Sequence, residues 1–67
     1  MPVIQIDIRE GRTKEEKIAL GKALAQAAHD TIGAPIDYTY VIVREHPGYH
    51  HIKAGQPLPE YDRERGY

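Results

Sequence analysis

The fold of this chain is set at its beginning, by the stretch PVIQIDIR at residues 2–9. Ile4, Ile6 and Ile8 alternate with polar residues, and this period of two is typical of a β-strand with one buried face. The isoleucines are therefore expected to face a core, and the polar residues to face solvent or a partner.

A helix is predicted directly after this strand. Thr13 and Glu16 have the spacing of a capping box, so the helix is expected to begin after Thr13. Gly33 suits the position that follows a helix, and Pro35 prevents continuation. A stripe of small and apolar residues recurs at helical spacing, at Leu20, Ala23, Leu24, Ala27, Ala28 and Thr31.

A second strand is predicted at residues 38–44, YTYVIVR, whose β-branched and aromatic residues are apolar on both faces. This pattern is typical of a central, buried strand. Strand, helix and strand form an α/β fold, a β-α-β unit with parallel strands and a right-handed crossover. Residues 49–53 are expected to form a short strand or hairpin arm, and 56–67 an extended tail rich in proline and charge. Residues 1–67 are expected to form a single domain.

The chain is short for a stable domain. It has 67 residues and no cysteine, and domains of this size usually need a disulfide, a metal or a partner subunit. Two strands under one helix leave one sheet face and both edges unprotected. We therefore expect two chains to pair edge to edge into a four-stranded sheet with two helices, and such dimers to stack.

Composition excludes several classes of function. The formal charge of −1 gives little attraction for nucleic acid. No apolar run is long enough to cross a membrane, and no signal peptide is visible, so a cytoplasmic location is expected. His50 and His51 would point to opposite faces of a strand, so no metal site is expected, and nothing indicates a cofactor.

Pro2 is the first candidate for chemistry. Met1 is normally removed when a small residue follows, which would leave a prolyl secondary amine at the start of the chain. An α-amino group has a pKa of about 7.7–8.0, and burial or nearby cations lower it. Such an amine is a neutral base near physiological pH. On these residues alone, the use of proline at a strand start explains Pro2 more simply, and retained Met1 would block the amine.

Arg9 and Arg12 are the second candidates. They flank Glu10 and Gly11 at the end of the first strand, and an arginine fork suits a carboxylate held by two hydrogen bonds. On local sequence alone, a solvated loop with surface ion pairs explains them as well.

Together these segments resemble the tautomerase superfamily, in its short 4-oxalocrotonate tautomerase-like branch. The resemblance runs from Pro2 to about Tyr61. It is carried by MPVIQI at residues 1–6, EGRT at 10–13, the alanine-rich helix and GAP at 33–35. It implies dimers that assemble further, commonly as trimers of dimers, and hence a homohexamer that needs no cofactor.

The resemblance also implies residue roles. Pro2 matches the general base, and Arg12 matches the arginine that binds a substrate carboxylate, usually supplied by a neighbouring subunit. Tyr40 stands where 4-oxalocrotonate tautomerase has a second arginine, and His51 where it has a pocket phenylalanine. Both are expected to shape the substrate pocket.

A second branch shares other residues. Arg9 beside Arg12 resembles the α chain of trans-3-chloroacrylic acid dehalogenase, in which paired arginines hold the substrate carboxylate. Lys53 occupies the place of the glutamate that activates water there. Whether Arg9 or Arg44 replaces the missing second-strand arginine, and what Lys53 does, stays open.

The first hypothesis is an isomerase, a cofactor-independent tautomerase of small unsaturated 2-hydroxy or 2-keto acids, reactions that belong to aromatic degradation. Pro2 would move the proton, while Arg12 and Arg9 bind the carboxylate. One alternative is hydration, dehalogenation or decarboxylation of haloacrylate-like or β-keto acids, with protonated Pro2 as the acid. The other is a non-catalytic oligomeric binding module.

Overall fold

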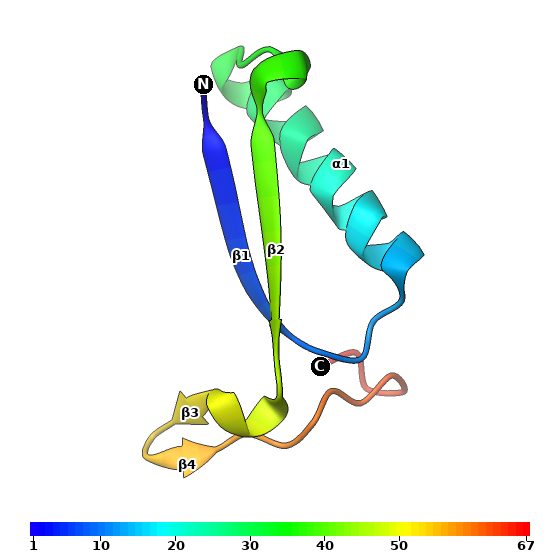
Figure 1. The fold of residues 1–67 in the computed structure, drawn as a ribbon, viewed down its shortest axis with the longest axis vertical. Helices are drawn as coiled ribbons and strands as arrows, with labels where there is room; N and C mark the ends of the chain where they lie inside the picture. Colours follow the sequence, from blue (N-terminus) through cyan, green and yellow to red (C-terminus); the bar gives the residue numbers. More distant parts are fainter.

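The computed structural model describes all residues, 1–67 (Figure 1). Its elements follow in the order β1 (Val3–Arg9), α1 (Lys14–Ile32), η1 (Ile36–Tyr38), β2 (Tyr40–His46), η2 (Gly48–His50), β3 (Ile52–Lys53) and β4 (Gln56–Pro57). β1 and β2 are parallel, with Val3 opposite Tyr40 and Arg9 opposite His46, whereas β3 and β4 form an antiparallel hairpin. The predicted β-α-β chain with a hairpin arm is confirmed.

Several predicted boundaries are wrong by a few residues, and the second strand also ends two residues later than predicted, at His46. The second strand begins at Tyr40 and not at Tyr38, because residues after Pro35 first form the 3₁₀ turn η1, in which Tyr38 N–H donates to Pro35 O at 3.1 Å. In the arm, residues 49–50 belong to η2, so the strand is confined to Ile52–Lys53. Its partner strand takes Gln56 and Pro57 from the start of the predicted tail.

Both ends of α1 have the expected local chemistry. The Thr13 hydroxyl accepts from Glu16 N–H at 3.1 Å, and the Glu16 carboxylate accepts from Thr13 N–H at 2.8 Å. At the other end Gly33 adopts φ 73°, a left-handed conformation that glycine takes at low cost, and donates to His29 O. The capping box therefore sets where the chain turns back after β1.

The predicted helix stripe is only partly right. Leu20, Leu24 and Ala28 are shielded, but Ala23, Ala27 and Thr31 are exposed. Gly21 and Ala25 turn inward instead, and an added Cβ on Gly21 would lie 3.9 Å from the Val41 side chain. Small residues at these positions let the helix axis come close to β2, which hydrophobicity alone does not reveal.

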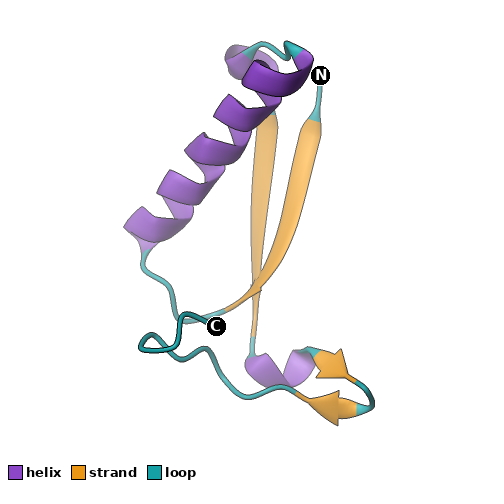
Figure 2. Cartoon of the chain, turned by 180° about the vertical axis from the view of Figure 1, so that it is seen from behind, coloured by secondary structure: helices purple, strands orange, loops and turns teal.

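Only one face of the β1–β2 sheet is covered, as Figure 2 shows from behind. The isoleucines of β1 and Val41 and Val43 of β2 share the face under α1, as predicted. On the other face Val3, Tyr40 and Ile42 are 49%, 56% and 44% exposed. The prediction that β2 is buried on both faces is thus wrong for a single chain.

The surface area confirms how open this chain is. Its accessible surface is 5050 Å², whereas a compact monomer of 7.6 kDa would expose about 4,300 Å². Only Ala25, Ala34 and Gly48 are buried. One chain therefore lacks a core of its own, which favours burial against other chains. No helix is long and apolar enough to cross a membrane.

Glu16 makes stability depend on pH in acid. Hydrogen bonds, first from Arg63 and then from Thr13 N–H, lower the pKa of Glu16 from 4.5 to about 2. Its ionised form therefore stabilises the fold above pH 4.5, and this contribution is lost as the pH falls to about 2. We predict that Glu16→Gln lowers the melting temperature by a few degrees at pH 7, and by progressively less between these two pH values.

Glu15→Gln is the matched control for this experiment, because Glu15 lies in the same helical turn without a hydrogen-bond partner. Circular dichroism melts of the three proteins at pH 7, 4.5 and 2 make the comparison. A melting-temperature difference for Glu16→Gln that stays constant down to pH 2 would contradict the assignment.

Candidate active site

Pro2 lies at the start of β1, beside the start of β2. Its carbonyl accepts a hydrogen bond from Tyr40 N–H at 3.0 Å, which fixes it against the neighbouring strand. Pro2 is half-buried, and Met1 before it is 76% exposed. Met1 is therefore open to enzymatic removal, while the proline ring stays held at the end of the sheet. Tyr40 is the predicted site residue that shares this end.

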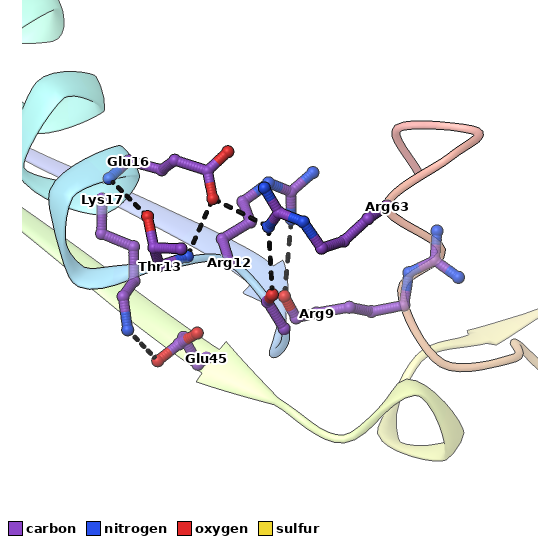
Figure 3. Close-up of polar contacts among 8 residues, drawn as sticks. Arg9, Arg12, Thr13, Glu16, Lys17, Glu45 and Arg63 are labelled. Carbon is purple, nitrogen blue, oxygen red and sulfur yellow. Dashed lines mark hydrogen bonds and ion pairs between the residues drawn. The ribbon is translucent and has the colours of Figure 1, made fainter.

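The two predicted arginines lie at the opposite end of β1 (Figure 3). Arg9 is the last residue of the strand, and its Nη1 donates to Pro59 O at 2.7 Å. Arg12 follows in the turn before α1, and its Nη1 donates to Arg9 O at 3.4 Å. Both side chains are half-buried. Most of their donors have no partner within the chain, so they can bind an anion.

The length of β1 separates these two groups. From Pro2 to Arg9 the chain is extended throughout, which at about 3.3 Å per residue spans roughly 20 Å. A small carboxylic acid cannot reach both within one chain. Pro2 and Tyr40 therefore form one half of the predicted site, and the arginines another.

His51 and Lys53 lie with the arginine half. The His51 carbonyl accepts from Leu58 N–H at 2.8 Å, and its Nε2 is buried without a hydrogen-bond partner. Lys53 and Arg9 line one cavity of about 410 Å³ whose wall also includes Leu58 and Pro59. This arm thus places Lys53 on the same cavity as Arg9.

Arg44 is already engaged by Asp7, which sequence reasoning did not single out. Arg44 donates to both carboxylate oxygens of Asp7, at 2.9 and 3.0 Å, and His46 Nε2 lies 2.8 Å from the same carboxylate. Arg44 and then His46 hold the pKa of Asp7 at about 2, against an ordinary 3.8. Within one chain Arg44 is therefore less available for substrate than Arg9. The signal that could have revealed this ion pair is the parallel register of β1 and β2, which sets Asp7 opposite Arg44.

The histidines do not lie on a strand as assumed. His50 ends η2 and His51 follows it, and both rings approach His46, with centroids 6.5 and 5.6 Å away. No group of three or more potential metal ligands in residues 1–67 has a geometry suited to a metal ion.

Sequence reasoning also missed two residues of the tail. The Tyr61 ring lies under the Arg12 guanidinium, with 4.1 Å from Cζ to the ring centroid. Arg63 Nη1 donates to Glu16 Oε1 at 2.9 Å. In the sequence, the segment 62–65 is a run of charged residues with no sign of a contact to the rest of the fold. The ion pair between Arg63 and Glu16 is visible only in the structure.

Fold and residue placement define the class of protein: an α/β chain with a proline at the start of one strand and arginines at its far end. A family model described as "Tautomerase enzyme" matches residues 2–60. The chain therefore belongs to the tautomerase family and is an isomerase.

Two curated relatives cover most of the chain. A probable tautomerase of Ralstonia nicotianae is 49% identical over 57 residues, 85% of this chain and 81% of the relative. A 2-hydroxymuconate tautomerase of Pseudomonas putida is 35% identical over 63 residues, 94% of this chain and all of the relative. The likeness therefore extends over most of this chain.

Solved structures agree with this assignment. N2, a member of the 4-oxalocrotonate tautomerase family, is 60% identical with a TM-score of 0.85, over 92% of this chain and 97% of its own. A trans-3-chloroacrylic acid dehalogenase, covalently inactivated by 3-bromopropiolate, is 34% identical with a TM-score of 0.81, over 91% and 100%. A heterohexameric 4-oxalocrotonate tautomerase from Chloroflexus aurantiacus is 32% identical with a TM-score of 0.81, over 85% and 92%. The fold is that of the 4-oxalocrotonate tautomerase-like branch.

Proposed function

We propose that this protein is a cofactor-independent tautomerase of small unsaturated 2-hydroxy or 2-keto carboxylic acids, such as those formed when aromatic compounds are degraded. Pro2, freed by removal of Met1, is the general base. Arg12 and Arg9 bind the substrate carboxylate, and Tyr40 and His51 shape the pocket. The name of the Pseudomonas relative supports this substrate class.

The observation that carries the proposal is the placement of Pro2 and the arginines at opposite ends of β1. Each active site then takes Pro2 and Tyr40 from one chain and Arg9, Arg12 and His51 from another. The uncovered sheet face, with Val3, Tyr40 and Ile42 exposed, gives chains a reason to associate. A homohexamer of 7.6 kDa chains, arranged as a trimer of dimers, is consistent with the heterohexameric relative.

The mechanism needs only a proton and fixed charges. The neutral amine of Pro2 accepts a proton from the substrate, either from its hydroxyl or from one carbon. The cationic arginines hold the carboxylate and stabilise the negative charge that develops on the enolate. The Pro2 ammonium then returns the proton to another carbon. The same proton is used throughout, so no oxidant or other co-reactant is required.

Mixing two inactive variants tests whether the site is shared between chains. Pro2→Ala and Arg12→Ala homo-oligomers should each lose activity on 2-hydroxymuconate, Pro2→Ala by about 10²-fold as for loss of a general base. If chains of both variants are unfolded and refolded together in equal amounts, about a quarter of the sites combine one intact Pro2 with one intact Arg12. We therefore expect about a quarter of the wild-type activity to return.

Two controls accompany the mixing experiment. Pro2→Ala refolded with the double variant Pro2→Ala/Arg12→Ala has no intact proline and should stay inactive. Light scattering should give a mass of six chains for every preparation. No recovery from correctly assembled mixed hexamers would overturn the shared site.

The state of the amine predicts the pH dependence of the reaction. A base must be unprotonated, so kcat/KM should fall on the acid side as the amine of Pro2 gains a proton, with one proton taken up. The measurement is a pH–rate profile on protein whose intact mass shows that Met1 is absent. A kcat/KM that does not decrease at acid pH would contradict the role of Pro2 as the base. Protein that retains Met1 should be inactive.

A second candidate, hydration with dehalogenation, is favoured by the closeness of Arg9 and Arg12 and by the dehalogenase among the structural neighbours. Lys53, in the place of the glutamate that activates water in the dehalogenase, lines the arginine cavity, and an ammonium cannot deprotonate water as a carboxylate can. The two carboxylates in the same cavity, Glu60 and Asp62, accept hydrogen bonds from backbone N–H groups of the chain. We therefore expect chloride release from 3-chloroacrylate to be slower than tautomerisation by at least 10²-fold in kcat/KM. Ion chromatography measures the chloride, and comparable rates would favour the second candidate.

A further inference from the structure

The C-terminal segment, residues 59–63, contacts both arginines of the proposed site. Pro59 O accepts from Arg9, Tyr61 lies against Arg12, and Arg63 reaches back to α1. The family model ends at residue 60, whereas the alignment with the Pseudomonas putida relative covers 63 of the 67 residues and so includes Tyr61 and Arg63.

The contact between Arg12 and Tyr61 is close and constrained. The guanidinium carbon lies 4.1 Å from the ring centroid, within the range of a cation–π interaction. Both side chains are half-buried. An added Cβ on Gly11, which has φ 131°, would lie 2.9 Å from Tyr61 Cδ2. The turn and the ring are thus packed so tightly that only glycine fits between them.

Arg63 anchors the segment. Its Nη1 donates to Glu16 Oε1 at 2.9 Å and to Gly11 O at 3.5 Å (Figure 3). Glu16 belongs to the capping box, so the anchor is attached to the start of α1. With a pKa of about 2, Glu16 is ionised at neutral pH. Tyr61 is therefore held between fixed points, Pro59 before it and Arg63 after it.

This arrangement leaves Arg12 free to bind substrate. A guanidinium binds a carboxylate through the N–H groups along its edge, whereas Tyr61 covers a face of its plane. Arg12 donates only one hydrogen bond within the chain, a long one of 3.4 Å from Nη1 to Arg9 O. The ring thus restricts the orientation of the guanidinium without taking the donors that a carboxylate needs.

We propose that Tyr61 is a positioning residue for the substrate carboxylate: it stacks on Arg12 and orients its guanidinium edge, and Arg63 holds Tyr61 in place through Glu16. This inference rests on the proposed function, in which Arg12 binds that carboxylate. It assigns to two residues of the C-terminal segment a part in substrate binding by a neighbouring active site.

The test compares substitutions at Tyr61 that keep or remove the aromatic face. With phenylenolpyruvate as the substrate, Tyr61→Leu should lower kcat/KM about two- to fivefold, the loss expected for one exposed cation–π contact. Tyr61→Phe keeps the ring and should retain the wild-type value. Arg63→Met should lower kcat/KM about twofold through loss of the anchor. The methyl ester of the substrate, which offers no carboxylate, should be turned over equally by wild type and Tyr61→Leu.

Controls separate a positioning role from a structural one. Tyr49→Leu removes a tyrosine outside the segment, one that is more exposed than Tyr61, and should leave kcat/KM unchanged. In an Arg12→Ala background, Tyr61→Leu should have no further effect on kcat/KM, because the guanidinium that Tyr61 contacts is absent. The hexamer mass and the melting temperature of each variant are measured alongside.

The outcomes distinguish this inference from the function on which it rests. If Arg12→Ala lowers kcat/KM but Tyr61→Leu does not, the positioning role is wrong and the proposed function stands. A gain in activity with Tyr61→Leu would show that the ring obstructs Arg12, which also overturns the inference. If Arg12→Ala has no effect on the acid, both fail. Equal losses on the acid and its ester would show a merely structural role.

Discussion

The parallel pairing of β1 with β2 is the constraint from which the rest of this structure follows. Parallel strands need a crossover, and α1 supplies it on one face only. The same pairing sets Pro2 beside Tyr40 at one end and Arg9 beside His46 at the other. A site that uses both the amine and the arginines must therefore be built between chains. Assembly is then a requirement of the chemistry as well as of stability.

The distribution of burial and charge agrees with this division of the chain into a proline end and an arginine end. The face away from α1 has exposed apolar residues at its proline end and the Asp7–Arg44–His46 cluster at its arginine end. One chain exposes more surface than a compact protein of its mass would. Arg9, Arg12 and Lys53, which make no ion pair within the chain, are gathered at one end. The chain thus offers an apolar surface for association and a cationic one for a small anion.

The segment after the hairpin shows how a small chain can hold a flexible arginine. Arg12 lies in the turn between β1 and α1, and its guanidinium makes one long hydrogen bond within the chain, to Arg9 O. The Tyr61 ring and the Arg63–Glu16 ion pair provide restraint from a distance of about fifty residues in sequence. Surface ion pairs contribute little to stability, but one that orients a binding group can matter more for affinity than for folding.

Local patterns determined much of this protein from the sequence alone. The alternation of Ile4, Ile6 and Ile8, the Thr13–Glu16 capping box and Gly33 are short-range chemistry, and each is found where it was predicted. The candidate residues Pro2 and Arg12 were also visible, through their resemblance to a family. Only the tertiary structure decided that Gly21 and Ala25 pack inward, that Asp7 engages Arg44, and that Tyr61 covers Arg12. These contacts join residues distant in sequence, and their geometry depends on how closely the helix approaches the sheet and where the tail returns.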